Sequence, residues 1–236
     1  MLKRGLWALV PAAGTGRRMG AKCPKQYLKL RDRTVLQHTL ERLDGFAPLQ
    51  GILVGIASDD SYWPTLSIRI PRLLGSFPGG AERAHTVLNG LEALAASAQD
   101  HDWVLVHDAV RPCVRHTDMH RLVDAVGDDP DGGLLGLPLA DTVKRTDDEG
   151  RVMATVSRHG LWRALTPQIF PIGVLRDALR RALADGVEVT DEASAIEHAG
   201  GKPRMVAGHA DNIKITVPGD LALAELYLQR QAVEAD

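Results

Sequence analysis

Glycines and basic residues gather in one loop near the start of the chain. Residues 11–20 read Pro-Ala-Ala-Gly-Thr-Gly-Arg-Arg-Met-Gly, and Lys22 and Lys25 follow. Glycine lets backbone N–H groups converge on an oxyanion, because no Cβ stands in the way. Arg17, Arg18 and the two lysines add positive charge at the same place. This combination predicts a triphosphate site, in which Arg18 and Lys25 would stabilise the charge that phosphoryl oxygens gain in a transition state.

The spacing of this loop differs from two common nucleotide-binding motifs. Met19 occupies the third glycine position of a dinucleotide-binding fingerprint, and no acid stands clearly at the expected ribose position. No Gly-Lys-Ser/Thr run closes the loop as it does in a P-loop. A plain glycine turn is the alternative, and the basic residues favour phosphate binding over it.

A carboxylate follows the clearest apolar run of the chain. Residues 103–107 (Trp-Val-Leu-Val-His) predict a buried strand, and Asp108 comes directly after it. Mg²⁺ in proteins is commonly held by one or two carboxylates together with phosphate oxygens. Asp108 is therefore a candidate to meet an Mg²⁺ ion carried by a triphosphate, and the alternative is an Asp that caps the next turn. His107 does not indicate a transition-metal site, because the nine His residues show no ligand spacing.

A second glycine turn precedes a predicted helix. Gly79 and Gly80 are followed closely by Glu82, Arg83 and Thr86. Backbone and side chains there could contact the base or ribose of a nucleotide. An ordinary helix start, with Glu82 at the positive end of the helix dipole, explains the same residues equally well.

Short apolar strands and amphipathic helices alternate along the chain and must position these residues. Strands are predicted at residues 6–10, 51–56, 68–74, 103–107, 133–137, 202–206 and 213–217. Helices are predicted at residues 35–43, 81–96, 119–126, 174–183, 190–199 and 221–229. Strands that are apolar along their whole length are typical of a parallel sheet covered on both faces. We therefore expect an α/β fold, a Rossmann-like, mostly parallel twisted sheet flanked by helices, with ligands beyond the carboxyl ends of the strands.

Three local signals refine this pattern. Pro71 indicates that residues 68–74 form an edge strand, because proline cannot donate to a sheet. Thr190 is a suitable N-cap for residues 190–199, with two acids in the first turn. Pro218 stands where the first turn of a helix tolerates it.

The polar segment at residues 141–156 departs from the α/β pattern. Two β-prone runs flank a turn at Asp148, Glu149 and Gly150, which predicts a hairpin. It is too polar for the core of the sheet, so we expect a projecting β-hairpin arm. A subunit interface would cover its edges, and the alternative is a solvated surface hairpin.

Composition limits the class of protein. No linker or shift in composition divides the 236 residues, so residues 1–236 are predicted to form a single domain. A formal charge of −2 gives no reason to expect a nucleic-acid partner. Cys23 and Cys113 lack metal-like spacing and favour a reduced, cytoplasmic setting. The apolar run at residues 6–10 is too short for a signal peptide, and no run approaches a membrane span, so no membrane partner is expected.

Taken together, these segments resemble the 2-C-methyl-D-erythritol 4-phosphate cytidylyltransferases, a family of the non-mevalonate isoprenoid pathway, nearly end to end. The segments on the nucleotide side, shared with many nucleotidyltransferases, are residues 11–19, 24–27 (Pro-Lys-Gln-Tyr), 79–83 (Gly-Gly-Ala-Glu-Arg) and 106–112 (Val-His-Asp-Ala-Val-Arg-Pro). The further segments are residues 141–142 (Asp-Thr), 161–162 (Leu-Trp), 165–168 (Leu-Thr-Pro-Gln), 190–194 (Thr-Asp-Glu-Ala-Ser) and 210–214 (Ala-Asp-Asn-Ile-Lys). Those from Arg158 onward are the more specific.

The resemblance implies transfer of CMP from CTP to methylerythritol phosphate, with Mg²⁺, giving CDP-methylerythritol and pyrophosphate. The substrate phosphate would attack the α-phosphorus of CTP in line, without a covalent enzyme intermediate. Arg18 and Lys25 would then stabilise the transition state, and Arg158 and Lys214 would hold the substrate phosphate. The other implied contacts are, for CTP, Ala12, Ala13, Gly14, Thr15, Gly16, Gly80, Arg83, Thr86 and Asp108 and, for the acceptor, Asp108, Arg111, Thr142, Thr166 and Thr190.

The resemblance also implies a homodimer in which the arm at residues 141–156 reaches the neighbour and completes the acceptor site. Position 81 is Ala where some relatives carry an acid, so it receives no side-chain role. Thr86 stands where Ser also occurs and keeps the hydroxyl. The length leaves no room for the cyclodiphosphate synthase domain that some relatives carry, so we expect one activity.

Two other functions compete with this interpretation. A cytidylyltransferase for another polyol phosphate, such as ribitol 5-phosphate, would share the first loop and the Asp108 segment. Arg158 and residues 190–194 favour methylerythritol phosphate over it. A non-catalytic nucleotide-binding protein of the same fold would be expected to lack a cation such as Arg18, Lys25 or Lys214, and all three are present.

Overall fold

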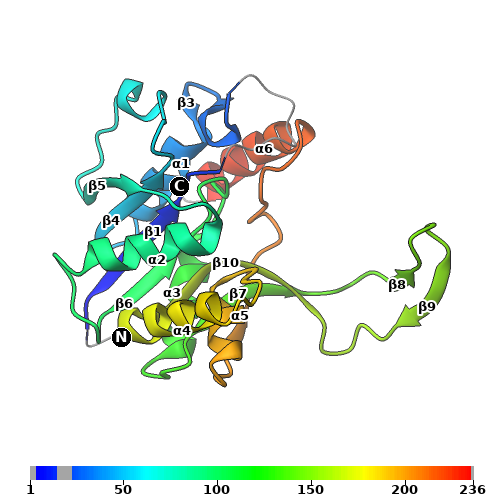
Figure 1. Ribbon diagram of the computed structural model, residues 1–236. Coiled ribbons are helices and arrows are strands. Elements are labelled where there is room, and N and C mark those ends of the chain that lie inside the picture. The colour runs from blue at the N-terminus through cyan, green and yellow to red at the C-terminus, as the bar shows by residue number, and fades with distance from the viewer. Residues whose placement is uncertain (1–3, 15–22, 235–236) are drawn as a thin grey trace.

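A seven-stranded sheet forms the centre of the protein, as the computed structural model in Figure 1 shows; it describes residues 4–14 and 23–234. The strands lie in the order β11-β7-β10-β6-β1-β4-β5. The pairs are parallel except those that β10 makes with β6 and β7. The strands are β1 (Leu6–Pro11), β4 (Leu49–Ile56), β5 (Leu73–Pro78), β6 (Trp103–Val106), β7 (Gly133–Pro138), β10 (Trp162–Pro171) and β11 (Arg204–Ala207). The expected mostly parallel α/β sheet is confirmed.

The pairing of β1 with β6 brings two of the predicted site segments together. β1 is buried from Leu6 to Val10, and β6 is buried along its whole length. The two strands are parallel, with Leu9 opposite Val106. Carboxyl ends of parallel strands meet at one edge of a sheet. The loop after β1 and Asp108 after β6 therefore line the same pocket.

Strand β10 was not predicted from the sequence. It runs antiparallel between β6 and β7, where Gln168 lies opposite both Val106 and Leu134. The register with β7 shifts between Ala164 and Gln168, a stretch that contains Pro167, which has no N–H to donate. Polar residues and proline break the apolar run, so the sequence does not read as a buried strand although its second half is buried.

Two other strand predictions need correction. Residues 213–217 form no strand; this segment crosses the loop after β6, where the Ile215 N–H donates to the Val110 carbonyl at 3.0 Å. Of residues 68–74, only the last two belong to a strand, because β5 begins at Leu73. β5 does lie at the edge of the sheet, as the proline in that segment indicated.

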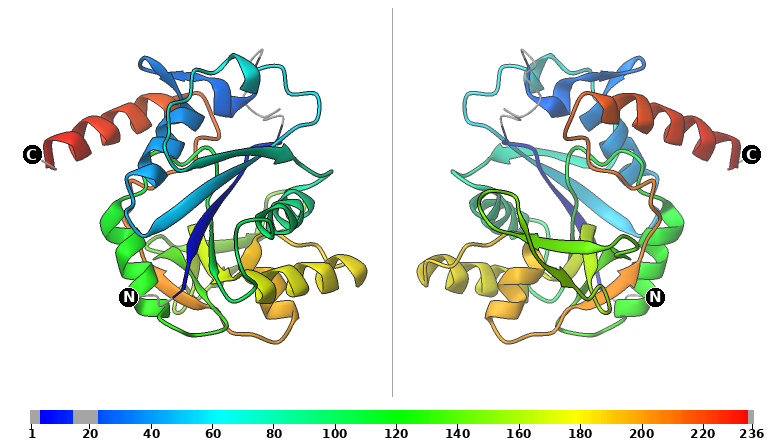
Figure 2. Two further views of the ribbon diagram at one scale, coloured as in Figure 1. Left: turned by 90° about the vertical axis from the view of Figure 1, so that its left-hand side faces the viewer. Right: turned by 90° about the vertical axis from the view of Figure 1, so that its right-hand side faces the viewer.

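Helices cover both faces of the sheet, as the two views of Figure 2 show. One face carries α1 (Val35–Asp44) and α3 (His116–Val126), and the other carries α2 (Arg83–Leu94), α4 (Ile172–Ala184) and α5 (Glu192–His198). α1 illustrates why these segments are helical: Leu36, Leu40 and Leu43 follow a helical period and are fully buried. The last helix is α6 (Gly219–Glu234). Nowhere in the described chain is a helix long and apolar enough to cross a membrane.

The predicted hairpin arm is confirmed. β8 (Val143–Thr146) and β9 (Val152–Val156) pair with each other in a separate two-stranded sheet. Figure 1 shows the arm extending away from the central sheet. Asp147 shapes its turn by accepting hydrogen bonds from the N–H groups of Glu149 and Arg151, and Gly150 has φ of 80°. Such a positive φ favours glycine.

Candidate active site

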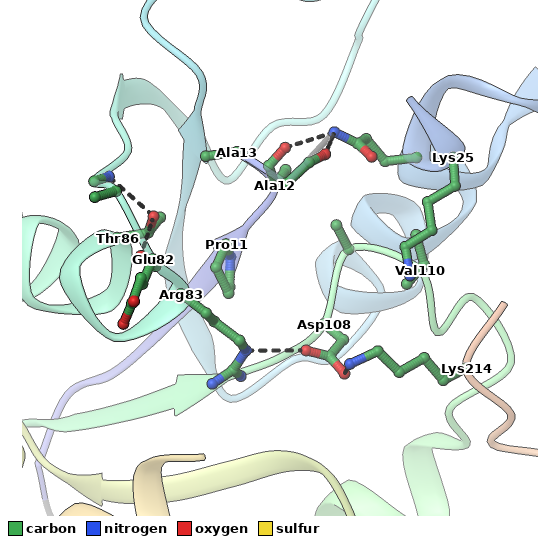
Figure 3. Close-up of a pocket in the computed structure, with 15 residues that line it drawn as sticks. Pro11, Ala12, Ala13, Lys25, Glu82, Arg83, Thr86, Asp108, Val110 and Lys214 are labelled. Carbon is green, nitrogen blue, oxygen red and sulfur yellow. Dashed lines mark hydrogen bonds and ion pairs between the residues drawn. The ribbon is translucent and has the colours of Figure 1, made fainter. Parts of the chain in front are cut away.

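A pocket lies at the edge of the sheet where β1 and β6 end (Figure 3). Its lining consists of residues 11–14, 25–26, 80–83, Thr86, residues 108–110 and Lys214. We call this the first pocket. The parallel strands end at one edge of the sheet, and the loops that follow them lie together there. Segments far apart in the chain therefore meet at this pocket.

Gln26 fixes the backbone of the first loop. Its amide nitrogen donates to the carbonyls of Ala12 at 2.6 Å and Gly14 at 3.0 Å, and the side chain is 3% exposed. The Ala12 N–H donates to the Gly55 carbonyl at 2.7 Å, which ties the loop to β4. Within the described residues, the N–H groups of Ala13 and Gly14 have no hydrogen-bonded acceptor. Glycine and alanine N–H groups held in this way can bind phosphate oxygens.

The second glycine turn packs directly against the first loop. A Cβ at Gly79 would lie 2.4 Å from the Cβ of Ala13, so only glycine permits this approach. The Gly80 N–H donates to the Thr86 hydroxyl at 3.0 Å, and that hydroxyl donates to the Glu82 carbonyl at 3.1 Å. Thr86 therefore shapes the turn through its hydroxyl.

Asp108 is surrounded by three cations. Its Oδ1 lies 3.3 Å from Nε of Arg83, and its Oδ2 lies 3.3 Å from Nε of Arg111 and 2.9 Å from Nζ of Lys214. Figure 3 shows the carboxylate between Arg83 and Lys214. Burial raises the pKa of Asp108, but Arg83, Lys214 and Arg111 outweigh burial and hold that pKa below its ordinary value. The Lys214 side chain is 38% exposed and can still reach a ligand.

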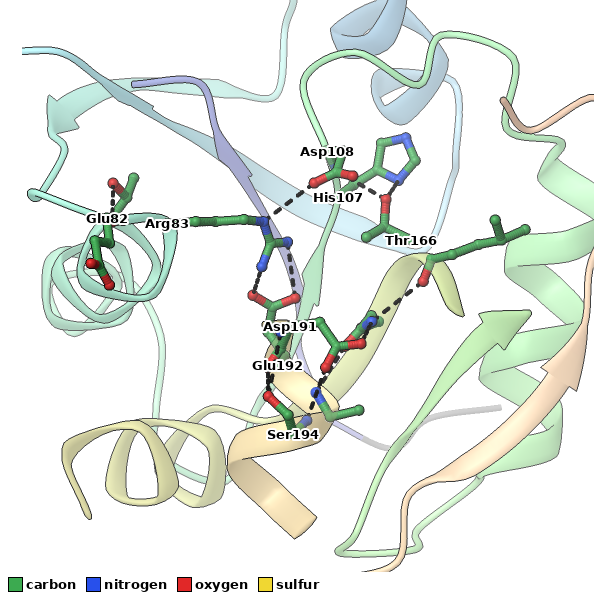
Figure 4. Close-up of polar contacts among 12 residues, drawn as sticks. Glu82, Arg83, His107, Asp108, Thr166, Asp191, Glu192 and Ser194 are labelled. Atoms are coloured by element: carbon green, nitrogen blue, oxygen red, sulfur yellow. Dashed lines mark hydrogen bonds and ion pairs between the residues drawn. The ribbon is translucent and has the colours of Figure 1, made fainter. Parts of the chain in front are cut away.

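The hydroxyl of Thr166 links His107 to the backbone of Asp108 (Figure 4). The Asp108 N–H donates to the Thr166 hydroxyl at 3.0 Å, and that hydroxyl lies 3.1 Å from Nδ1 of His107. Nε2 of His107 lies 3.0 Å from the Arg111 carbonyl, which can only accept, so Nε2 carries the proton and Nδ1 accepts from Thr166. Burial lowers the pKa of His107 to about 4.

Arg83 joins Asp108 to a second carboxylate, Glu192 (Figure 4). Its Nη1 and Nη2 donate to the two Glu192 oxygens at 2.5 and 3.0 Å. Burial lowers the pKa of the Arg83 guanidinium, but Glu192 and Asp108 raise it above its ordinary value. Burial raises the pKa of Glu192 above its ordinary value and Arg83 opposes this shift; the guanidinium fork, bound to both oxygens, is the charged partner of this carboxyl group.

A second pocket adjoins the first at this ion-pair cluster. It is lined by Arg83, Asp108, Arg111, residues 164–166, Gln168, Thr190, Asp191 and Lys214. Arg83, Asp108 and Lys214 line both pockets. Two ligands can therefore lie side by side, with the cations between them facing the negative charge of both.

Comparisons with known proteins agree over nearly the whole chain. The sequence model of the family IspD, 2-C-methyl-D-erythritol 4-phosphate cytidylyltransferase, matches residues 6–230. The chain belongs to this family. A member from Hahella chejuensis is 52% identical, over 98% of this chain and 95% of its own length.

Solved structures of family members share the fold. A 4-diphosphocytidyl-2C-methyl-D-erythritol synthase superposes with a TM-score of 0.84 at 37% identity, covering 97% of this chain and all of its own. The 2-C-methyl-D-erythritol 4-phosphate cytidylyltransferase of Francisella tularensis gives a TM-score of 0.81 at 32% identity, covering 94% of this chain and 99% of its own.

In this cytidylyltransferase, the structure places most of the predicted site residues together. The first pocket gathers Ala12, Ala13, Gly14, Lys25, Gly80, Arg83, Thr86, Asp108 and Lys214. The second pocket adds Arg111, Thr166 and Thr190. Arg18, Thr15 and Gly16 lie outside the described residues. Their roles, and those of the gathered residues, stay predictions.

Thr142 and Arg158 are not brought to either pocket of their own chain. Both are exposed and belong to the base of the arm, where the Arg158 guanidinium donates to the Ala140 carbonyl. Figure 1 shows the arm leaving the sheet in the direction away from α2 and β5. Neither residue lines the first or the second pocket, and their predicted roles stay predictions.

Three side chains for which the sequence predicted no role hold other groups of the site in place. Gln26 and Glu192 stood inside quoted motifs, and Gln168 did as well. Gln168 donates to the Asp191 carboxylate at 2.9 Å and accepts from the Ala193 N–H at 2.9 Å, which fixes the start of α5. Asp191, not Thr190, is the N-cap of that helix, and it accepts the Ser194 N–H at 3.0 Å. A polar residue inside a specific motif, with no evident ligand, is the signal that could have identified them.

The described residues offer Mg²⁺ no cluster of protein ligands at Asp108, and a contact between this carboxylate and an Mg²⁺ ion carried by CTP stays a prediction. Both oxygens of this carboxylate are engaged by cations, and nowhere in the described chain do three or more His, Cys, Asp or Glu side chains cluster as metal ligands do. A cation among three positive side chains would meet repulsion rather than ligands. A Mg²⁺ ion held mainly by phosphate oxygens and water needs few protein ligands.

Proposed function

We propose that this chain transfers CMP from CTP to 2-C-methyl-D-erythritol 4-phosphate, giving CDP-methylerythritol and pyrophosphate in the non-mevalonate route to isoprenoids. One observation carries the proposal: two pockets, the first with a glycine-rich phosphate cradle, adjoin at a shared cluster of Arg83, Asp108 and Lys214. A transfer between two phosphorylated substrates needs such an arrangement, because the reacting atoms must meet in a fixed geometry. Membership of the cytidylyltransferase family over residues 6–230 supports the choice of substrates.

CTP occupies the first pocket in this proposal. The N–H groups of Ala13 and Gly14 face the triphosphate, and the Gly79–Gly80 turn admits the nucleotide because it adds no side chains. Lys25 lies on the pocket wall and neutralises phosphate charge. Arg18, beyond the described residues, is assigned the same task.

The methylerythritol phosphate occupies the second pocket, with Thr190 on its wall and its phosphate next to Lys214. An oxygen of that phosphate attacks the α-phosphorus of CTP. A new P–O bond forms as the bond to the bridging oxygen of the β-phosphate breaks, and pyrophosphate leaves with the electron pair. The cations of Lys25 and Lys214 stabilise the charge on the oxygens of the pentacoordinate transition state.

The acceptor site is completed by a second copy of the chain in this proposal. Arg158 and Thr142 lie at the base of the arm and line neither pocket of their own chain, so we assign them to the pockets of the neighbour. Two apolar residues on the arm, Val152 and Met153, are 61% and 67% exposed in the single chain. A second copy of the chain would cover them. A molecular mass of two chains in sedimentation equilibrium is expected; a monomer that is fully active would contradict the shared site.

Mg²⁺ is proposed as a cofactor that arrives with CTP. Bound to the phosphate oxygens, it supplies charge neutralisation of the triphosphate. A cytoplasmic location is proposed as well, and it is supported by Cys23 and Cys113, neither of which forms a disulfide.

A pyrophosphate-release assay tests the function. The purified chain is given CTP with methylerythritol phosphate, and in parallel CTP with ribitol 5-phosphate. We expect release with the first acceptor at a kcat/KM far above that with the second. Equal rates with both acceptors would refute the choice of acceptor, and no release with either would refute the activity.

A further inference from the structure

Glu192 is a buried carboxylate that the proposed chemistry does not use. It begins α5, it is 1% exposed, and both of its oxygens are bound by the fork of Arg83. A buried carboxylate costs free energy unless it is paired, and Arg83 is the pair of Glu192. Its partner, Arg83, begins α2 on the other side of the cluster.

All three nitrogens of the Arg83 guanidinium bind carboxylates of the protein. Nη1 and Nη2 donate to Glu192, and Nε donates to Oδ1 of Asp108. A planar fork bound at three nitrogens has one orientation. Arg83 is therefore held against Asp108.

The position of Asp108 in turn sets the position of Lys214. Arg83 takes Oδ1, which leaves Oδ2 for Lys214 at 2.9 Å and Arg111 at 3.3 Å. With Asp108 and Glu192 both ionised, the five groups of the cluster carry three positive and two negative charges, so one positive charge remains for an incoming phosphate. If Glu192 were neutral, Asp108 would be the remaining anionic partner of the Arg83 fork within the cluster. A fork turned onto both Asp108 oxygens would compete with Lys214.

The support under Glu192 is rigid. Asp191 caps α5, and Gln168 on β10 binds both the Asp191 carboxylate and the Ala193 N–H. Figure 4 shows this chain of contacts running from α5 through Glu192 and Arg83 to Asp108. The wall of the second pocket is thereby joined to the wall of the first.

We propose that Glu192 is a positioning residue: by holding the Arg83 fork against Asp108, it sets the place of the Lys214 ammonium group between the two substrates. The inference deepens the proposed function and rests on it. Glu192 touches neither substrate and acts only through Arg83.

The test is Glu192→Gln, which keeps the size of the side chain and removes its charge. Because a misplacement of about 1 Å in a catalytic group can cost about 100-fold, we expect kcat/KM to fall about 10- to 100-fold. The KM for methylerythritol phosphate rises, because the Lys214 ammonium no longer faces its phosphate. If the substitution only reduced the fraction of folded protein, the apparent kcat would fall and the KM for methylerythritol phosphate would stay unchanged. Glu197→Gln, an exposed position on the same helix, is the matched control and keeps wild-type kinetics.

A double-mutant cycle tests the route through Arg83. Glu192→Gln is measured in the wild type and in Arg83→Gln. If Glu192 acts through Arg83, the double variant is no worse than Arg83→Gln alone, within about twofold. Losses that multiply would overturn the proposal, as would wild-type KM and kcat in folded Glu192→Gln.

If Glu192→Gln cannot be recovered folded, Glu192→Asp takes its place, since it keeps the charge but cannot reach the fork. A raised KM for the sugar phosphate in that variant supports the proposal, and wild-type kinetics overturn it. Wild-type enzyme is assayed alongside. An inactive wild type contradicts the proposed function, whereas an active wild type with unaffected Glu192 variants contradicts this inference alone.

Discussion

His107 makes the stability of this protein depend on pH in a defined window. The imidazole is fully buried beneath the site, where Nε2 donates to the Arg111 carbonyl and Nδ1 accepts from Thr166. A second proton on this ring would break the Thr166 hydrogen bond and place a charge in the core. The folded protein therefore keeps His107 neutral well below the pH at which an unfolded chain takes up the proton.

The size of the effect follows from the two pKa values. The pKa of His107 falls from an ordinary 6.5 to about 4 on folding. One pKa unit corresponds to about 1.4 kcal/mol, so the whole window is worth about 3 kcal/mol, and the part between pH 7 and pH 5 about 2 kcal/mol. In this window the unfolded state binds more protons than the folded state. The contribution is thus complete above about pH 6.5 and is lost as the pH falls toward 4.

Urea unfolding followed by circular dichroism at pH 7, 6 and 5 measures this contribution. His107→Gln keeps a donor for the Arg111 carbonyl and cannot titrate, so its free energy of unfolding should fall by about 2 kcal/mol less than that of the wild type between pH 7 and pH 5. His101→Gln, at an exposed position, should follow the wild type. Parallel pH curves for wild type and His107→Gln would refute the assignment of a neutral buried imidazole.

Four further predictions concern the substrates. Lys25→Ala should lower kcat by about 10²–10³, as removal of one donor to transition-state charge does, and unchanged turnover in folded protein would exclude Lys25 from the mechanism. Gln26→Leu should raise the KM for CTP and leave the KM for methylerythritol phosphate unchanged, because the carbonyls of the first loop lose their anchor; equal changes in both KM values would contradict this division. Arg158→Ala should raise the KM for methylerythritol phosphate while sparing that for CTP. At a methylerythritol phosphate concentration low enough that Arg158→Ala and Lys214→Ala each turn over slowly, mixing the two variants should restore part of the activity, because some mixed dimers then hold one intact site. No recovery would argue against a site shared between chains.

Much of the fold could be predicted from the sequence because its signals are local. The runs before Pro11 and Asp108 are short and apolar throughout, which is how strands buried on both faces read. The helical period of residues 35–43 is equally direct. β10 was not predicted because Pro167 and its polar neighbours interrupt the apolar pattern. It forms a strand because it pairs with β6 and β7 on its two sides. Residues 213–217 have a β-like pattern but no neighbouring strand to pair with.

The sequence by itself determined which kinds of group this protein brings to its site: glycines and small residues in the first loop, Lys25, Asp108 and Lys214. Residue types and motifs are enough for that, because binding phosphate needs cations and exposed backbone N–H groups. Which groups meet a ligand and which hold others was decided only by the tertiary structure. Arg83 and Glu192 are 109 residues apart, and their pairing depends on two helices starting at the same edge of the sheet. Arg158, at the base of the arm, lines neither pocket of its own chain, which no spacing in the sequence could show.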